Sequence, residues 1–303
     1  HDRELRRVQW SPAGDALAVA AGTPNRVFFT GRTGDDAVVI WDVSDPTAPV
    51  RRGTVPYQDS DNDVAWSPRG DTLAVSLGPR LYLVDPADPT RDTELVGHTD
   101  TVLDLAWYTD DTLASVSRDG TGILWDTAGK RSIRALPHPL TAGDREGLAE
   151  REAWLESVAW SPAGSVVAVG NRAGYLQLWD LTEPARPRPL GQLLAEMPWN
   201  RGIDGVRKLA WSPDGALLVA ARDNALFVWD TTDPSRPTIR QSIIMGSNFY
   251  PKPAFAWAPT GRLLAIVGDD ELRILNFDEP SSPVELGRVS WIFDGGWDRP
   301  LLW

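Results

Sequence analysis

Residues 211–215 read WSPDG, and variants of this pentapeptide recur along the chain. Each copy lies between two short apolar stretches, a pattern that predicts two strands joined by a tight turn. The tryptophans that begin these turns stand at intervals of 56, 41, 53, 51 and 46 residues, and they are Trp10, Trp66, Trp107, Trp160, Trp211 and Trp257. Self-similarity at this period predicts stacked supersecondary units.

The third repeat shows what one unit contains. Its apolar stretches are residues 102–107, 113–117, 123–126 and 132–136, and polar residues separate them. The alternation of apolar and polar residues predicts half-buried strands, and Gly120 suits a turn that needs positive φ. Four antiparallel strands in one such repeat form a blade of a β-propeller.

The composition narrows the class of protein. The chain has 303 residues, of which 42% are hydrophobic, with 15 tryptophans and no cysteine, so we expect a large core and no disulfide. It contains neither an apolar run long enough to span a bilayer nor a signal peptide, and we expect a cytoplasmic protein with no membrane partner. Its net charge of −12 opposes binding to phosphate backbones, so no nucleic acid partner is expected.

The motifs of these repeats resemble those of the WD-repeat (tryptophan–aspartate repeat) β-propeller family. The third repeat has that family's Gly97-His98 pair, an Asp in its second hairpin turn and a closing Trp125-Asp126 pair. Closing pairs recur at Trp41-Asp42, Trp179-Asp180 and Trp229-Asp230, with degenerate versions at Val84-Asp85 and Phe277-Asp278. The chain is identified as a bacterial, actinobacterial-like member of this family, and its 27 Arg against 3 Lys indicate a GC-rich coding bias.

The resemblance implies an all-β fold, a β-propeller of four-stranded antiparallel blades in a single domain. We expect six complete repeats, with approximate bounds of 1–56, 57–97, 98–137, 153–195, 205–245 and 253–289. Residues 290–303 are expected to begin a seventh blade, because Trp303 ends an apolar stretch 46 residues after Trp257. The alternative is a C-terminal tail packed on a complete six-bladed ring. We also expect the chain to be a fragment of a larger protein, since His1 lies within a repeat.

The family implies a hydrogen-bonded tetrad of His, Ser or Thr, Asp and Trp inside a blade. The third repeat supplies all four residues, which are His98, Ser115, Asp119 and Trp125. A buried His and Asp are unfavourable unless each satisfies the other. Val169 stands at the Ser position of the fourth repeat, so we expect most blades to be held by apolar packing and turns.

A second periodic motif, of the form Asp/Glu-Pro-x-x-Pro, follows the third strand of most repeats. It occurs at residues 45–49, 183–187, 233–237 and 279–283, with a partial copy at 88–89. Proline fixes φ and cannot donate to a ladder, so these copies predict rigid turns before an outer edge strand. The alternative is a proline-rich ligand motif.

Four insertions lengthen the repeats, at residues 22–36, 137–152, 196–205 and 245–253. In a propeller these junctions emerge on one face, and the proline-rich turns emerge on the other. Loops on a rigid scaffold often bind partners, and Arg and aromatic residues are enriched at binding hot spots. We therefore expect a protein or peptide partner, with packing of the loops onto the blades as the alternative. The candidate binding residues are Arg26, Phe28, Phe29, Arg32, Trp199, Asn200, Arg201, Phe249 and Tyr250.

Catalytic motifs are absent from the sequence. It has no His-Glu-x-x-His and no Gly-x-Ser-x-Gly, and Gly129-Lys130 lacks the upstream Gly of a phosphate loop. Residues 59–63 read DSDND, like a calcium loop, but the required Gly and bidentate acid are missing, which favours an acidic turn. We expect no metal, no cofactor and no catalysis in this chain.

These features favour a non-catalytic scaffold or sensor within a larger bacterial signalling protein, such as a signalling NTPase, whose other domains are further candidate partners. The alternative is the propeller of a serine hydrolase or peptidase, or a TolB-like protein, since these use similar Trp-Ser-Pro-Asp-Gly turns. A sugar-binding propeller would need an elaborated pocket in every blade, and the unequal insertions argue against it. A neighbouring nucleotide-binding domain would favour the sensor, and a neighbouring hydrolase domain would favour the alternative.

Overall fold

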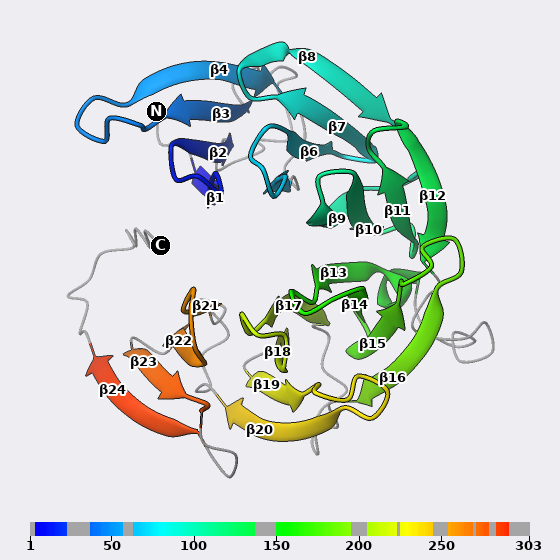
Figure 1. The fold of residues 1–303 in the computed structure, drawn as a ribbon, viewed down its shortest axis with the longest axis vertical. Coiled ribbons are helices and arrows are strands. Elements are labelled where there is room, and N and C mark those ends of the chain that lie inside the picture. Colours follow the sequence, from blue (N-terminus) through cyan, green and yellow to red (C-terminus); the bar gives the residue numbers. More distant parts are fainter. Residues whose placement is uncertain are drawn as a thin grey trace, which may run out of the picture.

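The computed structural model describes residues 4–22, 37–56, 63–136, 150–194, 205–222, 225–244, 254–268, 271–278 and 283–290. Within these ranges the chain forms six four-stranded antiparallel sheets, each built from consecutive strands. The sheets lie in an arc around a central opening, with the first strand of each sheet innermost and the fourth outermost (Figure 1). This arrangement confirms the predicted all-β propeller of four-stranded blades. In the described part of the chain, no helix is long and apolar enough to cross a membrane.

We number the sheets in chain order. Sheet 1 contains β1 (Glu4–Trp10), β2 (Ala16–Gly22), β3 (Ala37–Asp42) and β4 (Val50–Pro56), and sheet 2 contains β5 (Val64–Trp66), β6 (Leu73–Leu77), β7 (Arg80–Asp85) and β8 (Asp88–Leu95). Sheet 3 contains β9 (Val102–Thr109), β10 (Thr112–Ser117), β11 (Gly122–Asp126) and β12 (Arg131–Leu136). A short 3-10 helix, η1 (Glu150–Ala153), precedes sheet 4, which contains β13 (Leu155–Trp160), β14 (Val166–Asn171), β15 (Tyr175–Asp180) and β16 (Arg188–Leu194).

The last two sheets repeat the same order of strands. Sheet 5 contains β17 (Val206–Trp211), β18 (Leu217–Arg222), β19 (Ala225–Asp230) and β20 (Thr238–Ile244), and sheet 6 contains β21 (Ala254–Trp257), β22 (Leu263–Gly268), β23 (Glu271–Asn276) and β24 (Val284–Ser290). The strand expected to begin a seventh blade falls after β24, outside the described residues, and it stays a prediction.

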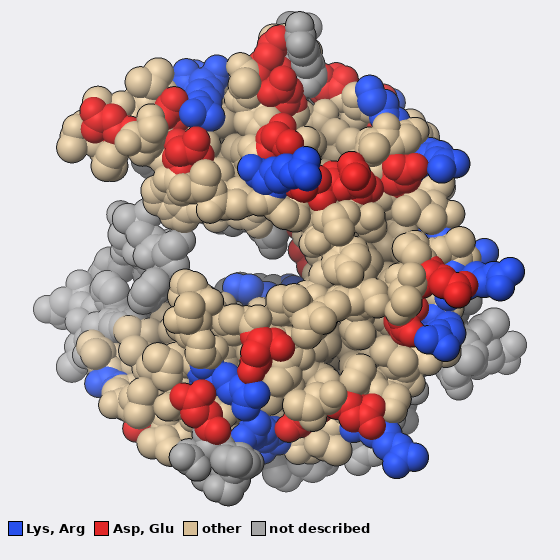
Figure 2. Space-filling model, viewed as in Figure 1, with Lys and Arg blue, Asp and Glu red and all other residues tan. Residues whose placement is uncertain are grey.

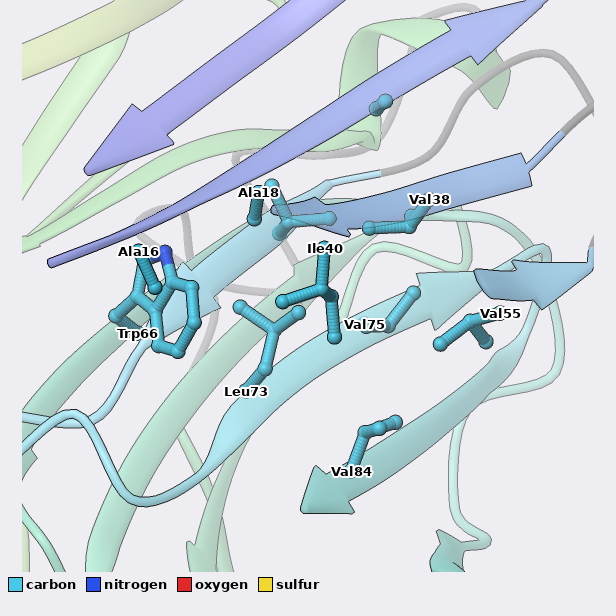
Figure 3. Packing of buried hydrophobic residues seen from close by; sticks show 11 residues of the cluster. Ala16, Ala18, Val38, Ile40, Val55, Trp66, Leu73, Val75 and Val84 are labelled. Atoms are coloured by element: carbon cyan, nitrogen blue, oxygen red, sulfur yellow. The ribbon is translucent and has the colours of Figure 1, made fainter. Parts of the chain in front are cut away.

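The apolar core lies between neighbouring sheets, because the inner strands of each sheet are apolar on both faces. Every residue of β18 is buried. Its alternate side chains face opposite ways, so that Leu218 packs against sheet 4 while Leu217 and Val219 pack against sheet 6. Between sheets 1 and 2, Ile40 points toward Leu73 of the facing sheet (Figure 3). Each sheet therefore depends on a neighbour to cover its faces.

The Ser-Pro-x-Gly motif forms the turn between the first and second strands. In the first copy the Ser11 hydroxyl donates to Asp15 over 2.8 Å and accepts from the Ala16 N–H over 2.9 Å. The glycine that ends the motif has positive φ in four copies, which are Gly14, Gly70, Gly215 and Gly261. A left-handed backbone strains any residue with a Cβ, and the turn therefore uses Gly.

The closing aspartates cap the turn between the third and fourth strands. Asp42 accepts from both the N–H and the hydroxyl of Ser44. These bonds and the Arg52 guanidinium lower the pKa of Asp42 to about 2. In sheet 6 the equivalent residue is Asn276, which accepts from the Asp278 N–H and lies in the last position of β23. The structure thus corrects the degenerate closing pair of the sixth repeat from Phe277-Asp278 to Leu275-Asn276.

The anchor tryptophans join neighbouring sheets through a repeated hydrogen bond, which we call the indole ladder. The Nε1–H of Trp66 donates to the carbonyl of Gln9, the residue before Trp10, over 3.1 Å. The same bond occurs in the next four sheets over 2.9–3.2 Å, from Trp107 to Ala65, Trp160 to Ala106, Trp211 to Ala159 and Trp257 to Ala210. The inner strands of sheets 2 to 6 are thereby each held to the sheet before them.

A second polar contact runs from sheets 2 to 5 to the sheet that follows, from a residue in the inner strand or just before it. Asp63 is buried and accepts from the Leu105 N–H over 2.9 Å. The residues at the same position in the next three sheets also bond to the backbone of the sheet that follows. Asp104 accepts from the Val158 N–H. Ser157 and Lys208 donate instead, to the carbonyls of Val206 and Phe255. The sequence pattern placed Asp63 in an acidic turn, but the structure shows it fastening two sheets, while residues 59–62 lie outside the described ranges.

Candidate functional site

The connections between strands define two faces of the molecule. We call one the loop face, and its described parts are residues 78–79, 96–101, 118–121, 150–154, 172–174 and 205. Backbone hydrogen bonds hold these segments side by side, from Arg118 to Thr101 and from Arg172 to Trp154. The other, the turn face, carries the Ser-Pro and proline-rich turns and is seen in Figure 2, where acidic and basic side chains lie next to one another in small mixed groups.

The structure brings His98, Ser115, Asp119 and Trp125 together beneath the loop face. His98 Nδ1 lies 3.0 Å from Asp119 Oδ2, and His98 Nε2 lies 2.7 Å from Ser115 Oγ. The indole N–H of Trp125 donates to the same Ser115 oxygen over 2.8 Å. Ser115 and Trp125 are almost completely buried. A chain of donors from Trp125 through Ser115 and His98 to Asp119 satisfies every polar group in it.

The carboxylate of Asp119 ends this chain. Burial by itself would raise the pKa of Asp119, but hydrogen bonds from His98, Thr121 and the Thr99 N–H lower it well below the usual range. All of these partners belong to the same repeat, so the network stabilises one blade internally. Its arrangement is structural, since the carboxylate and imidazole face each other and not an open cleft.

The fourth sheet lacks this network. Val169 stands where Ser115 stands in sheet 3, and the Nε1–H of Trp179 has no hydrogen-bond partner in the described part of the chain. Trp179 remains buried among apolar side chains of sheets 3 and 4. Packing therefore holds this tryptophan in place of hydrogen bonding, as the sequence predicts for most blades.

The nine residues predicted to bind a partner all lie outside the described residues. They are Arg26, Phe28, Phe29, Arg32, Trp199, Asn200, Arg201, Phe249 and Tyr250. Their role stays a prediction.

A different group of side chains stands on the described part of the loop face. We call it the Trp154 cluster, and it consists of Arg118, Trp154, Glu156 and Arg172. Trp154 follows η1 directly and is partly exposed. The guanidinium carbons of Arg118 and Arg172 lie 4.9 Å and 5.3 Å from the centre of its ring. Both distances are within the range of a cation–π contact.

Glu156 completes the cluster beneath Arg172. Its Oε1 accepts from Arg172 over 2.6 Å, with both side chains largely buried. The other carboxylate oxygen, Oε2, is buried and has no hydrogen-bond partner among the described residues. Arg172 is thus fixed on two sides, by the carboxylate and by the indole, and the pair presents a pre-organised surface.

The arginines of this cluster belong to a series that the sequence analysis missed. Arg118, Arg172 and Arg222 each stand seven residues before the closing tryptophan of sheets 3, 4 and 5. Arg222 lies against the neighbouring sheet, since a Cβ added at Gly174 would come within 2.5 Å of its guanidinium carbon. The recurrence of Arg in phase with the closing Trp is the sequence signal that locates this row.

Two shallow grooves lie on the turn face. The larger, of about 660 Å³, lies between sheets 2 and 3, and its charged lining includes Asp71, Asp85, Asp110, Asp111, Arg69 and Lys130. Arg69 pairs with Asp110 over 3.0 Å. Among the described residues, no group of His, Cys, Asp or Glu has the geometry of a metal site.

The family model described as "WD domain, G-beta repeat" matches residues 90–126, 149–180 and 194–230 of this chain. Protein HIR1 of Cryptococcus neoformans var. neoformans is 30% identical over 176 residues, which are 52% of this chain and 18% of that protein. Echinoderm microtubule-associated protein-like 4 of Xenopus laevis is 26% identical over 230 residues, which are 75% of this chain and 22% of that protein. The chain therefore spans less than a quarter of the length of these two relatives.

A solved structure shows the same fold. A chain in "Crystal Structure of Mitotic Checkpoint Complex" superposes with a TM-score of 0.67 at 18% identity, over 95% of this chain and 80% of the other. The fold and the repeated motifs thus define a β-propeller, and the family model and relatives support the WD-repeat family. The relatives named here are eukaryotic, so they do not support the expected bacterial origin.

Proposed function

We propose that this chain is a non-catalytic protein-interaction platform whose partner binds the Trp154 cluster. The supporting observation is the stacking of two guanidinium groups on one partly exposed indole. Tryptophan and arginine are the residues most enriched where binding energy concentrates. The cluster is also rigid, because Trp154 and Arg172 are joined through their backbones and Arg172 is held by Glu156. Rigid side chains lose little entropy when a partner binds.

The charge of the row suggests the chemistry of the partner. Arg118 and Arg172 of this row are partly exposed in successive sheets, whereas Arg222 is only 9% exposed, and the chain as a whole has a net charge of −12. A local group of arginines on an acidic protein attracts acidic side chains selectively, and the planar guanidinium can bind a carboxylate through two hydrogen bonds. An acidic peptide segment is therefore the proposed ligand.

The setting of the platform is a separate proposal. We propose that it acts as a sensor within a larger cytoplasmic signalling protein, as the repeat resemblance implies. The relatives named above support a WD-repeat similarity alone. The complexes that those proteins form are not assigned to this chain. A bacterial source remains a prediction from the sequence.

The test compares variants of the loop face with a matched variant of the turn face. Trp154→Ala and Arg118→Ala remove parts of the cluster, while Arg131→Ala removes an exposed arginine that pairs with Asp126 on the opposite face. Partners captured from source-cell extract are measured by quantitative mass spectrometry. We expect each cluster variant to lower capture of the specific partner by about fivefold or more, as for a hot spot.

The control variant separates binding from folding. Arg131→Ala should capture like the unmodified chain, and melting temperatures should show that all variants are folded. Capture that is unchanged in both cluster variants would exclude this site. In the same assay, Trp199→Ala and Arg201→Ala test the predicted loop residues, and a loss confined to them would move the site to those loops.

A further inference from the structure

The turn between the first two strands of sheet 3 departs from the repeated motif. In four other sheets a serine follows the anchor tryptophan, is buried, and accepts a hydrogen bond from a backbone N–H of the same hairpin. These serines are Ser11, Ser67, Ser161 and Ser212. In sheet 3 the residue after Trp107 is Tyr108, which is 37% exposed. This repeat thus gives up a buried hydroxyl that closes the turn, and it presents an aromatic ring on the turn face.

The Tyr108 ring is held in a fixed position against sheet 4. It stacks on the Trp160 indole, with 4.5 Å between the ring centres and 18° between the ring planes. The Trp160 indole is itself held by the indole ladder, through its bond to the Ala106 carbonyl. One face of the tyrosine ring is therefore covered, and the exposed part of the side chain is left for contact with another molecule. A rigid tyrosine contributes contact area to an interface at a low entropic cost.

The larger groove of the turn face begins at the same turn. Asp110 and Asp111 join β9 to β10, follow Tyr108 closely in the chain, and line the groove. The lining contains five aspartates and two basic residues, which leaves a net charge of −3. In Figure 2 acidic side chains form a row across this face, above and to the right of the central opening. Negative charge therefore lies beside the exposed ring.

Most of these carboxylates carry charge that no described basic side chain neutralises. In four other sheets the closing aspartate pairs with an arginine of the fourth strand. These pairs are Asp42–Arg52, Asp126–Arg131, Asp180–Arg188 and Asp230–Arg240. Asp85, the closing aspartate of sheet 2, accepts from the Ala87 N–H and has no such pair among the described residues. Asp92 and Asp111 are exposed and also lack an ion pair within the described part of the chain, whereas Asp110 pairs with Arg69.

We propose that this part of the turn face is a second docking surface, and that its occupant is a basic peptide segment of a partner protein. We call it the Tyr108 surface, and it consists of Tyr108, Asp85, Asp92 and Asp111. Arg or Lys side chains of the segment pair with the carboxylates, and one of them lies against the exposed part of the tyrosine ring. Charge complementarity selects this occupant, because the carboxylates lack basic partners of their own and no acidic group in the described residues has the geometry of a metal site. The surface lies on the opposite face from the Trp154 cluster, so the chain can hold a basic and an acidic partner at the same time.

Binding of a labelled peptide tests this proposal. The probe is a short fluorescent peptide in which Arg and Lys alternate with Ser, and its counterpart has Glu in place of each basic residue. Fluorescence anisotropy is measured at low ionic strength, where exposed charges are least screened. We expect the basic probe to bind, and the double variant Asp92→Asn, Asp111→Asn to raise its Kd by about fivefold. Tyr108→Ser introduces the serine found in four other sheets and should raise the Kd by about threefold.

Controls separate this surface from general charge effects, from misfolding and from the Trp154 cluster. Glu183→Gln removes an exposed acid of the turn face outside the groove and should leave the Kd unchanged. Trp154→Ala should also leave it unchanged, so the two docking surfaces are tested independently. Melting temperatures show that each variant is folded. Equal binding of the two probes, an unchanged Kd in the double variant or in Tyr108→Ser, or an equal loss in Glu183→Gln would each overturn the proposal.

Discussion

At the residue scale, single polar side chains decide which blades have an internal network. Ser115 serves two partners, the indole N–H of Trp125 and the imidazole of His98. Where Val169 replaces this serine, the indole of Trp179 is left without an acceptor in the described residues. A buried unsatisfied N–H typically costs about 1–3 kcal/mol, so sheet 4 retains an unfavourable term that sheet 3 avoids.

A hydroxyl introduced at position 169 should therefore gain a hydrogen bond that offsets the free-energy cost of burying it. Val169→Thr keeps the side-chain volume and offers Trp179 an acceptor, and we expect the free energy of unfolding to change by less than about 0.5 kcal/mol. Val167→Thr is the matched control, because Val167 is equally buried in the same strand and cluster. There the hydroxyl lacks that partner, and we expect a loss of about 1–2 kcal/mol in urea unfolding. Equal losses in the two variants would show that the hydroxyl introduced at position 169 does not reach the indole.

The lowered pKa of Asp119 predicts how stability depends on pH. Because the pKa is lower in the folded state than its ordinary value of 3.8, the carboxylate stabilises the protein above that value. This contribution is lost as the pH falls from 3.8 toward the folded pKa. We expect Asp119→Asn to be less stable than the unmodified chain at pH 7, with a difference that shrinks below about pH 4. Urea unfolding across this range measures it, and a difference that stays constant down to about pH 2 would contradict the assignment.

At the scale of elements, the turns carry most of the repeated sequence. The Ser-Pro-x-Gly turn joins the two innermost strands, and its backbone closes with a hydrogen bond from the Gly14 N–H to the Ser11 carbonyl over 2.9 Å. The closing aspartates cap the turn between the third and fourth strands, so the Asp of each Trp-Asp pair stabilises a turn and the Trp fills the interface. The dipeptide recurs because each residue meets a separate local requirement.

Two glycines of these turns make a matched pair for mutation. Gly215 has a φ of +69°, and a Cβ there would come within 2.5 Å of the Ala163 side chain. A Cβ added at Gly164, in the equivalent turn of sheet 4, would meet no atom within 4 Å, and Gly164 lacks positive φ. We expect Gly215→Ala to lower the free energy of unfolding by about 1–3 kcal/mol and Gly164→Ala to change it by less than about 0.5 kcal/mol. Thermal unfolding compares them, and similar melting temperatures would refute the strain argument.

Sequence reasoning succeeded where a local pattern has a local cause. The periodicity of the sequence was enough to locate the anchor tryptophans, the turn glycines and the strands between them, and it also predicted the fold. Asp63 was misjudged because its partner, the Leu105 N–H, is distant in sequence and its acidic neighbours suggested an exposed turn. The Trp154 cluster was missed because Arg118 and Arg172 meet only when two sheets pack together. The insertions drew attention to the residues within them, whereas Arg118 and Arg172 lie on short turns between the second and third strands of their sheets.

At the scale of the whole molecule, stability is shared between neighbouring sheets. Each sheet has its own hydrogen-bonded ladder, but its apolar faces are buried only by the sheets beside it. In such an array the stability is approximately a sum of repeat and interface contributions. Sheets 2 to 5 have two described interfaces each, whereas sheets 1 and 6 have one.

This difference predicts a gradient of local opening. We expect backbone amides of β14 and β18 to exchange more slowly with deuterium than those of β2 and β22, since the latter belong to the end sheets. Hydrogen–deuterium exchange with mass spectrometry of the chain measures this at peptide resolution. Uniform protection across the six sheets would indicate one cooperative unit and contradict the gradient.

The indole ladder has a consequence for how such a protein can evolve. Every unit offers its neighbours the same pair of groups, a tryptophan N–H on one side and a backbone carbonyl on the other. A gene segment encoding one unit can therefore be duplicated or lost in frame, and the units that become adjacent still meet compatible partners. Variation in copy number is thus chemically permitted, while a shift of the tryptophan by one residue within a unit is not, because the side chain would then point to the other face of the strand.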